Sequence, residues 1–174
     1  ATVYETTLGE PYLETYPLER DPRLEEMTSL LSERLRHTVE KKELFQKTEE
    51  VIETRVARAH RIAQGRFEGG AAFDSVFLST CTLMAAFRSL QMHNLAPLLA
   101  DQQIEEIYLD DAKSPIYVDH RRWGRCITSI YLAPEELEAF STRCGLESSK
   151  RLDEANPSLK TEIITKAFHI RASI

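Results

Sequence analysis

The chain has 174 residues, of which 42% are hydrophobic and 29% are charged, and these proportions are those of a globular protein that can bury a core without disulfides or metal. Its formal net charge of -6 argues against a nucleic-acid-binding protein, because such proteins usually present a dominant basic face. The cysteines are scattered, at Cys81, Cys126 and Cys144, which indicates reduced thiols and argues against a disulfide framework or a zinc site.

The N-terminal part of the chain contains prolines and no helical period, so we expect an extended arm over residues 1–21. It has no apolar run and therefore does not read as a signal peptide. The most apolar window, residues 75–87, is too short to cross a bilayer. Because the chain starts at Ala1 and stops at Ile174 within a strand pattern, we interpret it as a fragment of a longer, cytoplasmic protein.

Residues 22–92 are predicted to form a layer of three helices. An acidic residue followed by Pro22 is a typical helix start, and apolar residues then recur at helical spacing. A second helix is predicted over residues 43–63, with Gly65 and Gly69-Gly70 breaking the pattern after it. The third, over residues 72–92, is apolar enough to form the centre of the layer.

Residues 93–174 are predicted to form a small α/β domain with an antiparallel sheet, which makes the whole chain an α+β protein. A short helical segment leads into the first strand, and in the second strand Tyr117 and Asp119 share one face because side chains alternate. The expected elements are strands at 104–109, 115–120 and 126–131, a helix at 134–143 ended by Gly145, a loop at 146–160 and a hairpin at 161–174.

Six segments of this second region form an ordered set: NLAPLL (94–99), IEEI (104–107), PIYVDH (115–120), EEL (135–137), DEANPSLK (153–160) and IRASI (170–174). In this order they resemble the N-terminal domain of the secretion-superfamily ATPases, the hexameric motors of type II secretion, type IV pilus assembly and archaeal flagella. The resemblance is strongest to the archaeal branch. Glu106 stands where that family usually has Asp, and Asp111-Ala112 where it usually has a turn glycine.

The resemblance implies a part of a motor that works with ATP and Mg²⁺, assembles as a homo-hexamer and lies peripherally at the cytoplasmic membrane. Its implied partners are a C-terminal ATPase core domain and a membrane platform protein, and not nucleic acid. Arg171 matches the family's arginine that faces the nucleotide, and Arg151 is a second candidate for the phosphate contact. A guanidinium suits this role because it is planar, permanently charged and able to donate two parallel hydrogen bonds.

Residues 1–174 alone are not expected to be an enzyme. A P-loop needs a lysine and a serine or threonine after its second glycine. The one glycine pair with that spacing, Gly65 and Gly70, is followed by Ala71 and Ala72. We expect no catalytic residue and no metal site here, since no nucleophile, base and orienting acid occur in a recognisable order.

Two surface clusters remain open to more than one interpretation. The turn after the second strand carries Arg121, Arg122, Trp123 and Arg125, which form either an interface or a plain solvated turn. An acidic cluster is interpreted as structural or as part of an interface, in preference to metal-binding, because no histidine or asparagine lies at ligand spacing; its members are Asp101, Glu105, Glu106, Asp110 and Asp111.

A ligand-sensing or adaptor module that acts alone is the alternative function, because a small antiparallel sheet with helices is also typical of such modules. A small molecule retained through purification would favour this alternative over the motor domain.

Overall fold

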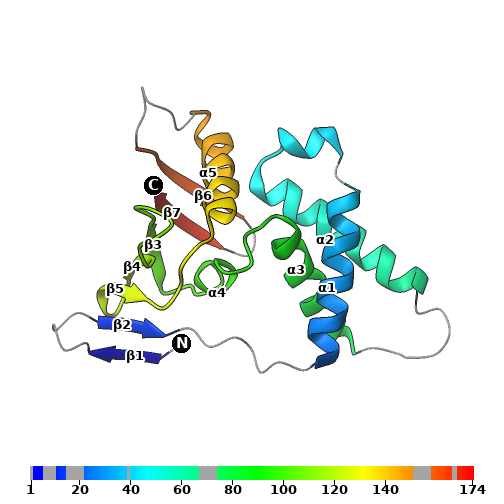
Figure 1. The fold of residues 1–174 in the computed structure, drawn as a ribbon, viewed down its shortest axis with the longest axis horizontal. Coiled ribbons are helices and arrows are strands. Elements are labelled where there is room, and N and C mark those ends of the chain that lie inside the picture. Colours follow the sequence, from blue (N-terminus) through cyan, green and yellow to red (C-terminus); the bar gives the residue numbers. More distant parts are fainter. Residues whose placement is uncertain are drawn as a thin grey trace. The chain divides into compact units, whose positions relative to one another are not determined.

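The computed structural model describes residues 2–5, 11–14, 22–38, 40–66, 74–150, 158–165 and 168–174 (Figure 1). Its contacts divide the chain into two units. Residues 18–93 form a helical unit, and residues 1–17 together with 94–174 form a sheet unit. The predicted α+β class is confirmed. No helix among the described residues is long and apolar enough to cross a membrane.

The helical unit contains the three predicted helices and one short 3-10 helix. These are α1 (Pro22–His37), η1 (Lys41–Leu44), α2 (Thr48–Arg66) and α3 (Ser75–Ser89). Asp74 caps α3, since its side chain accepts a hydrogen bond of 3.3 Å from the Val76 N–H. The core of the unit joins all three helices and consists of Met27, Leu31, Leu35, Ala59, Ala63, Cys81 and Ala85.

The prediction of a single helix over residues 43–63 is wrong at its N-terminal end. The chain forms η1, turns at residues 45–47 and only then enters α2. The turn lets the Glu43 carboxylate reach back to two arginines of α2, Arg55 and Arg58. Gly65 itself still lies in α2, in open space one residue before the helix ends at Arg66, where glycine costs about 1 kcal/mol relative to alanine. Gly69 and Gly70 lie outside the described residues.

The sheet unit is one seven-stranded sheet of order β1-β2-β5-β4-β3-β7-β6 with two helices. The elements are β1 (Thr2–Glu5), β2 (Pro11–Glu14), α4 (Ala96–Leu99), β3 (Ile104–Tyr108), β4 (Tyr117–His120), β5 (Gly124–Thr128), α5 (Pro134–Ser148), β6 (Lys160–Ile164) and β7 (His169–Ser173). Part of the expected N-terminal arm thus contributes two strands to this sheet. The predicted C-terminal hairpin is confirmed as β6 and β7.

The sheet is mixed, so the prediction of an antiparallel sheet is wrong for two of its pairs. β2 runs parallel to β5, and β3 runs parallel to β7. Parallel neighbours require a long connection. In the first case the connection contains the whole helical unit, and in the second it contains β4, β5, α5 and β6. Hairpin signals in a sequence reveal local antiparallel pairs, but they cannot reveal which distant strands become neighbours.

Strands β3 to β7 place alternate residues on a buried face and on an open face. The buried face includes Ile107, Val118, Cys126, Ile163 and Ala172. α5 packs against β6 and lies beside the C-terminal hairpin in Figure 1. Phe140 and Cys144 of this helix are buried. The polar residues of the alternate positions lie on the open face, which carries the candidate site.

α5 is longer than predicted, and Gly145 does not end it. The helix continues to Ser148 and ends at Ser149, whose φ of 56° is left-handed. The Lys150 N–H then donates a 3.1 Å hydrogen bond to the Gly145 carbonyl, which is a typical helix-ending contact. A Cβ on residue 145 would lie 2.8 Å from the Lys150 carbonyl oxygen, so this glycine permits close approach of the chain after the helix.

We expect Gly145→Ala and Gly65→Ala to change stability in opposite directions. Alanine is the better helix former, so Gly65→Ala, in open space, should raise the free energy of unfolding by up to about 1 kcal/mol. Gly145→Ala forces backbone atoms apart and should lower it by about 1–3 kcal/mol. Urea unfolding followed by circular dichroism measures both, and a stabilised Gly145→Ala variant would contradict the close approach.

Candidate functional site

Arg171 lies in the inner strand β7, on the open face of the sheet. β7 alternates between exposed and buried residues, with His169 and Arg171 exposed and Ile170 and Ala172 buried. Its neighbours in register are Glu162 on β6 and Glu106 on β3. In the part of the chain that the structure describes, the Arg171 side chain makes no hydrogen bond or ion pair. Its guanidinium donors are therefore available to a group from outside the described residues.

Two carboxylates near Arg171 are occupied by other donors. Glu162 Oε1 lies 2.7 Å from His169 Nε2, although Arg171 and not His169 is its direct neighbour across the strands. Asp119 accepts a 2.6 Å hydrogen bond from the Tyr108 hydroxyl and forms a 3.1 Å ion pair with Arg125 Nε. These contacts direct the carboxylates of Glu162 and Asp119 toward donors other than Arg171.

Tyr108, Asp119 and Arg125 form a connected polar group on the same open face. The Arg125 guanidinium carbon lies 4.0 Å from the centre of the Tyr108 ring, a cation–π contact. The hydrogen bond from Arg125 is the main cause of the lowered pKa of Asp119, to which Tyr108 and the charge of Arg171 also contribute. Burial and the neighbouring carboxylates of Asp119 and Glu106 raise the pKa of Tyr108 to about 12, so its hydroxyl stays protonated and acts as a donor.

The predicted arginine cluster lies at the turn between β4 and β5, but its members have different partners. Arg121 pairs with Glu105 at 3.2 Å, and Arg125 turns to Asp119 as described above. The Arg122 guanidinium carbon lies 4.6 Å from the centre of the Trp123 ring, and Trp123 is 43% exposed. Gly124, with a φ of 71°, supplies the left-handed turn residue. The turn therefore presents one stacked Arg–Trp pair and not a uniform basic patch.

The predicted acidic cluster does not assemble into a ligand set. The Asp111 carboxylate accepts hydrogen bonds from the backbone N–H groups of Lys113 and Ser114, and Asp101 accepts one from Gln103. Across the described ranges, no group of three or more histidine, cysteine, aspartate or glutamate residues lies close enough to hold a metal ion. Arg151, the second predicted phosphate contact, lies outside the described residues.

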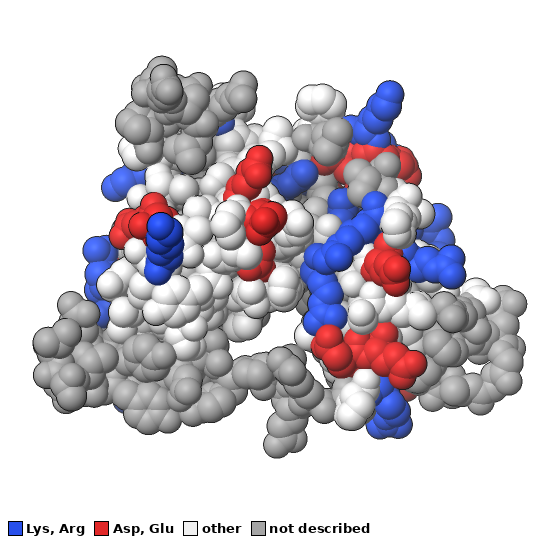
Figure 2. All heavy atoms as spheres, viewed as in Figure 1, with Lys and Arg blue, Asp and Glu red and all other residues white. Residues whose placement is uncertain are grey.

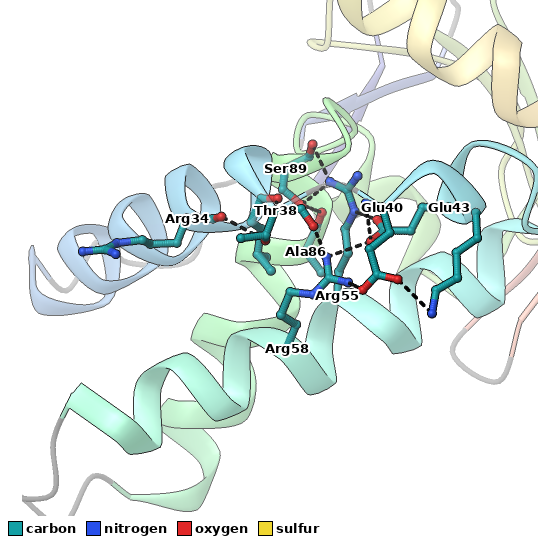
Figure 3. Close-up of polar contacts among 10 residues, drawn as sticks. Arg34, Thr38, Glu40, Glu43, Arg55, Arg58, Ala86 and Ser89 are labelled. Carbon is teal, nitrogen blue, oxygen red and sulfur yellow. Dashed lines mark hydrogen bonds and ion pairs between the residues drawn. The ribbon is translucent and has the colours of Figure 1, made fainter.

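A buried ionic network in the helical unit was not predicted (Figure 3). Glu43, 1% exposed, accepts hydrogen bonds from Arg55 Nε at 3.0 Å and from Arg58 Nη1 at 2.7 Å. Arg55, 5% exposed, also donates to the carbonyl and hydroxyl oxygens of Ser89 at the end of α3, and Arg58 donates to the Thr38 carbonyl after α1. The network therefore ties all three helices to η1.

The pKa values of this network favour the ionised pair. Burial pushes the pKa of the Glu43 carboxyl upward, but the hydrogen bond from Arg58 and the charge of Arg55 outweigh burial, and the net shift is downward. Burial also lowers the pKa of Arg55, which nevertheless stays charged at neutral pH because the ordinary pKa of arginine is above 12. The surface around the network is mixed in sign, and Figure 2 shows acidic and basic side chains interleaved on this unit.

The sequence contains a signal for part of the open-face site. Strand alternation places Tyr117 with Asp119 and His169 with Arg171 on common faces. The contacts of Asp119 with Tyr108 and of Glu162 with His169 depend on the register between strands, which no local pattern gives.

No protein-family model matches this chain, and no curated protein sequence is significantly similar to it.

Proposed function

We propose that this chain is the N-terminal part of a hexameric secretion-superfamily ATPase and that its open sheet face contacts a nucleotide held by a separate core domain. The observation that carries the proposal is Arg171. It lies in the last of the six segments that resemble the family, it is exposed on the open face, and none of the described side chains pairs with it.

In this proposal Arg171 donates hydrogen bonds to phosphate oxygens of ATP, and the core domain supplies the P-loop. A guanidinium can do this without proton transfer, so the domain contributes charge and position and not a nucleophile or base. The described residues do not fit a magnesium site, so ligands for Mg²⁺ would have to come from elsewhere in the motor.

The proposal places the chain in a cytoplasmic ring at the membrane surface, next to a platform protein of a secretion, pilus or flagellum machine. ATP bound between Arg171 and the core domain would favour one angle between the two domains, and hydrolysis would release it. Binding energy at the nucleotide would thereby drive hinge-type domain motion, as in other proteins that close around a ligand.

The gene sequence beyond Ile174 tests this proposal directly. We expect an open reading frame that continues into a G-x-x-x-x-G-K-S/T segment, because those residues perform the phosphate chemistry of a motor ATPase. A stop codon immediately after Ile174 would contradict the motor function and would favour a domain that acts alone.

A further inference from the structure

We infer that His169 and Glu162 make anion binding at Arg171 dependent on pH, an inference that rests on the phosphate-contact function proposed for Arg171. The geometry on the open face carries it. His169 and Arg171 are two residues apart in β7 and share a face, so their side chains start about 7 Å apart. Glu162 lies directly across from Arg171, yet its carboxylate is 2.7 Å from the His169 ring.

The pair keeps its geometry in both protonation states, and only its charge changes. Nε2 of histidine can donate to the Glu162 carboxylate whether the ring is neutral or protonated. With His169 protonated, the two charges cancel and Arg171 is left as the net positive group on this part of the face. With His169 neutral, the negative charge of Glu162 stands beside Arg171 and competes with any bound anion.

Other charged groups also face this site. Lys160 on β6, Glu106 on β3 and Asp119 on β4 share the open face, and the pKa of Asp119 is lowered by its hydrogen bond from Arg125. Histidine is the side chain whose charge ordinarily changes between about pH 5 and pH 8. The described residues around Arg171 thus contain one group suited to this switch, His169.

The consequence is that a phosphate-bearing ligand should bind better in mildly acidic solution. Both members of the pair are half-exposed, at 58% for the His169 side chain and 51% for the Glu162 side chain, so solvent screens their effect. We therefore expect a modest change of about two- to fivefold in affinity, the size of one exposed charge interaction.

Sulfate binding to this chain tests the inference, because sulfate keeps its charge throughout the range in which histidine titrates. Chemical shifts of the Arg171 Nε–H group would be followed by NMR at about pH 5.5 and about pH 8, at constant ionic strength. We expect the affinity of the unsubstituted chain to be about two- to fivefold higher at the lower pH. In His169→Gln the pH dependence should disappear, because Glu162 then keeps its negative charge beside Arg171 at both pH values. In Glu162→Gln the affinity should exceed that of the unsubstituted chain at both pH values, because a negative charge is removed, and it should still be higher at the lower pH, where His169 adds a positive charge.

The outcomes separate the two proposals. Equal affinity of the unsubstituted chain at both pH values, or a pH dependence that persists in His169→Gln, overturns the role of the pair while Arg171 remains an anion site. If sulfate fails to shift the Arg171 Nε–H resonance at either pH, the phosphate contact itself is overturned. The predicted pattern in both variants supports the inference.

Discussion

Arg171→Ala in the full-length ATPase that we propose is expected to lower the turnover of ATP by about 100-fold or more while the hexamer stays intact. The expected size is that of removing one positioned donor from a developing phosphate charge. The substitution should not disturb folding, because the side chain is exposed and makes no hydrogen bond or ion pair with the described residues. Steady-state ATP hydrolysis, together with ring size from gel filtration, measures both parts of the expectation.

Two further variants separate a specific contact from a general effect of charge. Arg171→Lys keeps the positive charge but loses the planar fork, so it should restore only part of the activity. Lys160→Ala removes a positive charge from the neighbouring strand on the same face and should leave turnover within about threefold, the scale of an exposed charge. Unchanged turnover in Arg171→Ala, or equal losses in it and Lys160→Ala, would exclude the proposed contact.

Arg55→Met is expected to lower the free energy of unfolding of the helical unit by about 3 kcal/mol or more. Methionine has a similar length and can fill the space, but it leaves the buried Glu43 carboxylate with one arginine instead of two and leaves the Ser89 oxygens without their donor. Breaking a buried, hydrogen-bonded ion pair costs about 3–5 kcal/mol because a charge stays buried without compensation. Urea unfolding followed by circular dichroism at the helix band would report this loss.

The matched control is Arg88→Met, which removes an arginine of the same unit from an ion pair near the surface. Arg88 contacts Glu25 at 2.8 Å, but the Glu25 side chain is 48% exposed, so the expected loss is below about 1 kcal/mol. Equal losses in Arg55→Met and Arg88→Met would contradict the buried network.

Acid is expected to lower the free energy of unfolding of the helical unit, as Arg55→Met does. Because the folded-state pKa of Glu43 is below its ordinary 4.5, the stability that its carboxylate contributes is present above that pH and is lost as the pH falls through the folded value.

The sequence was sufficient for the features that depend on local patterns. Pro22 marks the start of α1, and Pro134 marks the start of α5. The alternation of residue types from His169 to Ser173 indicates a strand with one buried face and one open face. In each case one residue or one period determines the backbone. The same alternation predicts that His169 and Arg171 share one face of the strand, but it does not say which face is open.

The features that sequence patterns missed depend on contacts between distant residues. The parallel pairing of β3 with β7 is decided by packing after both strands exist. The break between η1 and α2 accompanies the contact of Glu43 with Arg55, two residues that look like ordinary surface residues in a charged sequence. Gly145 resembled a helix stop because glycine is common there, whereas here it makes room for the Lys150 carbonyl oxygen.

The exposed position of Trp123 at the β4–β5 turn has a practical optical consequence. It is the only tryptophan in the sequence, and its ring is stacked against Arg122 instead of being packed in the interior of the sheet unit. Indole fluorescence responds to nearby charge and to water, so the intrinsic emission of this protein reports on one surface turn. A molecule that docks on the turn should therefore change the emission colour and lifetime even where the interior of either unit does not respond.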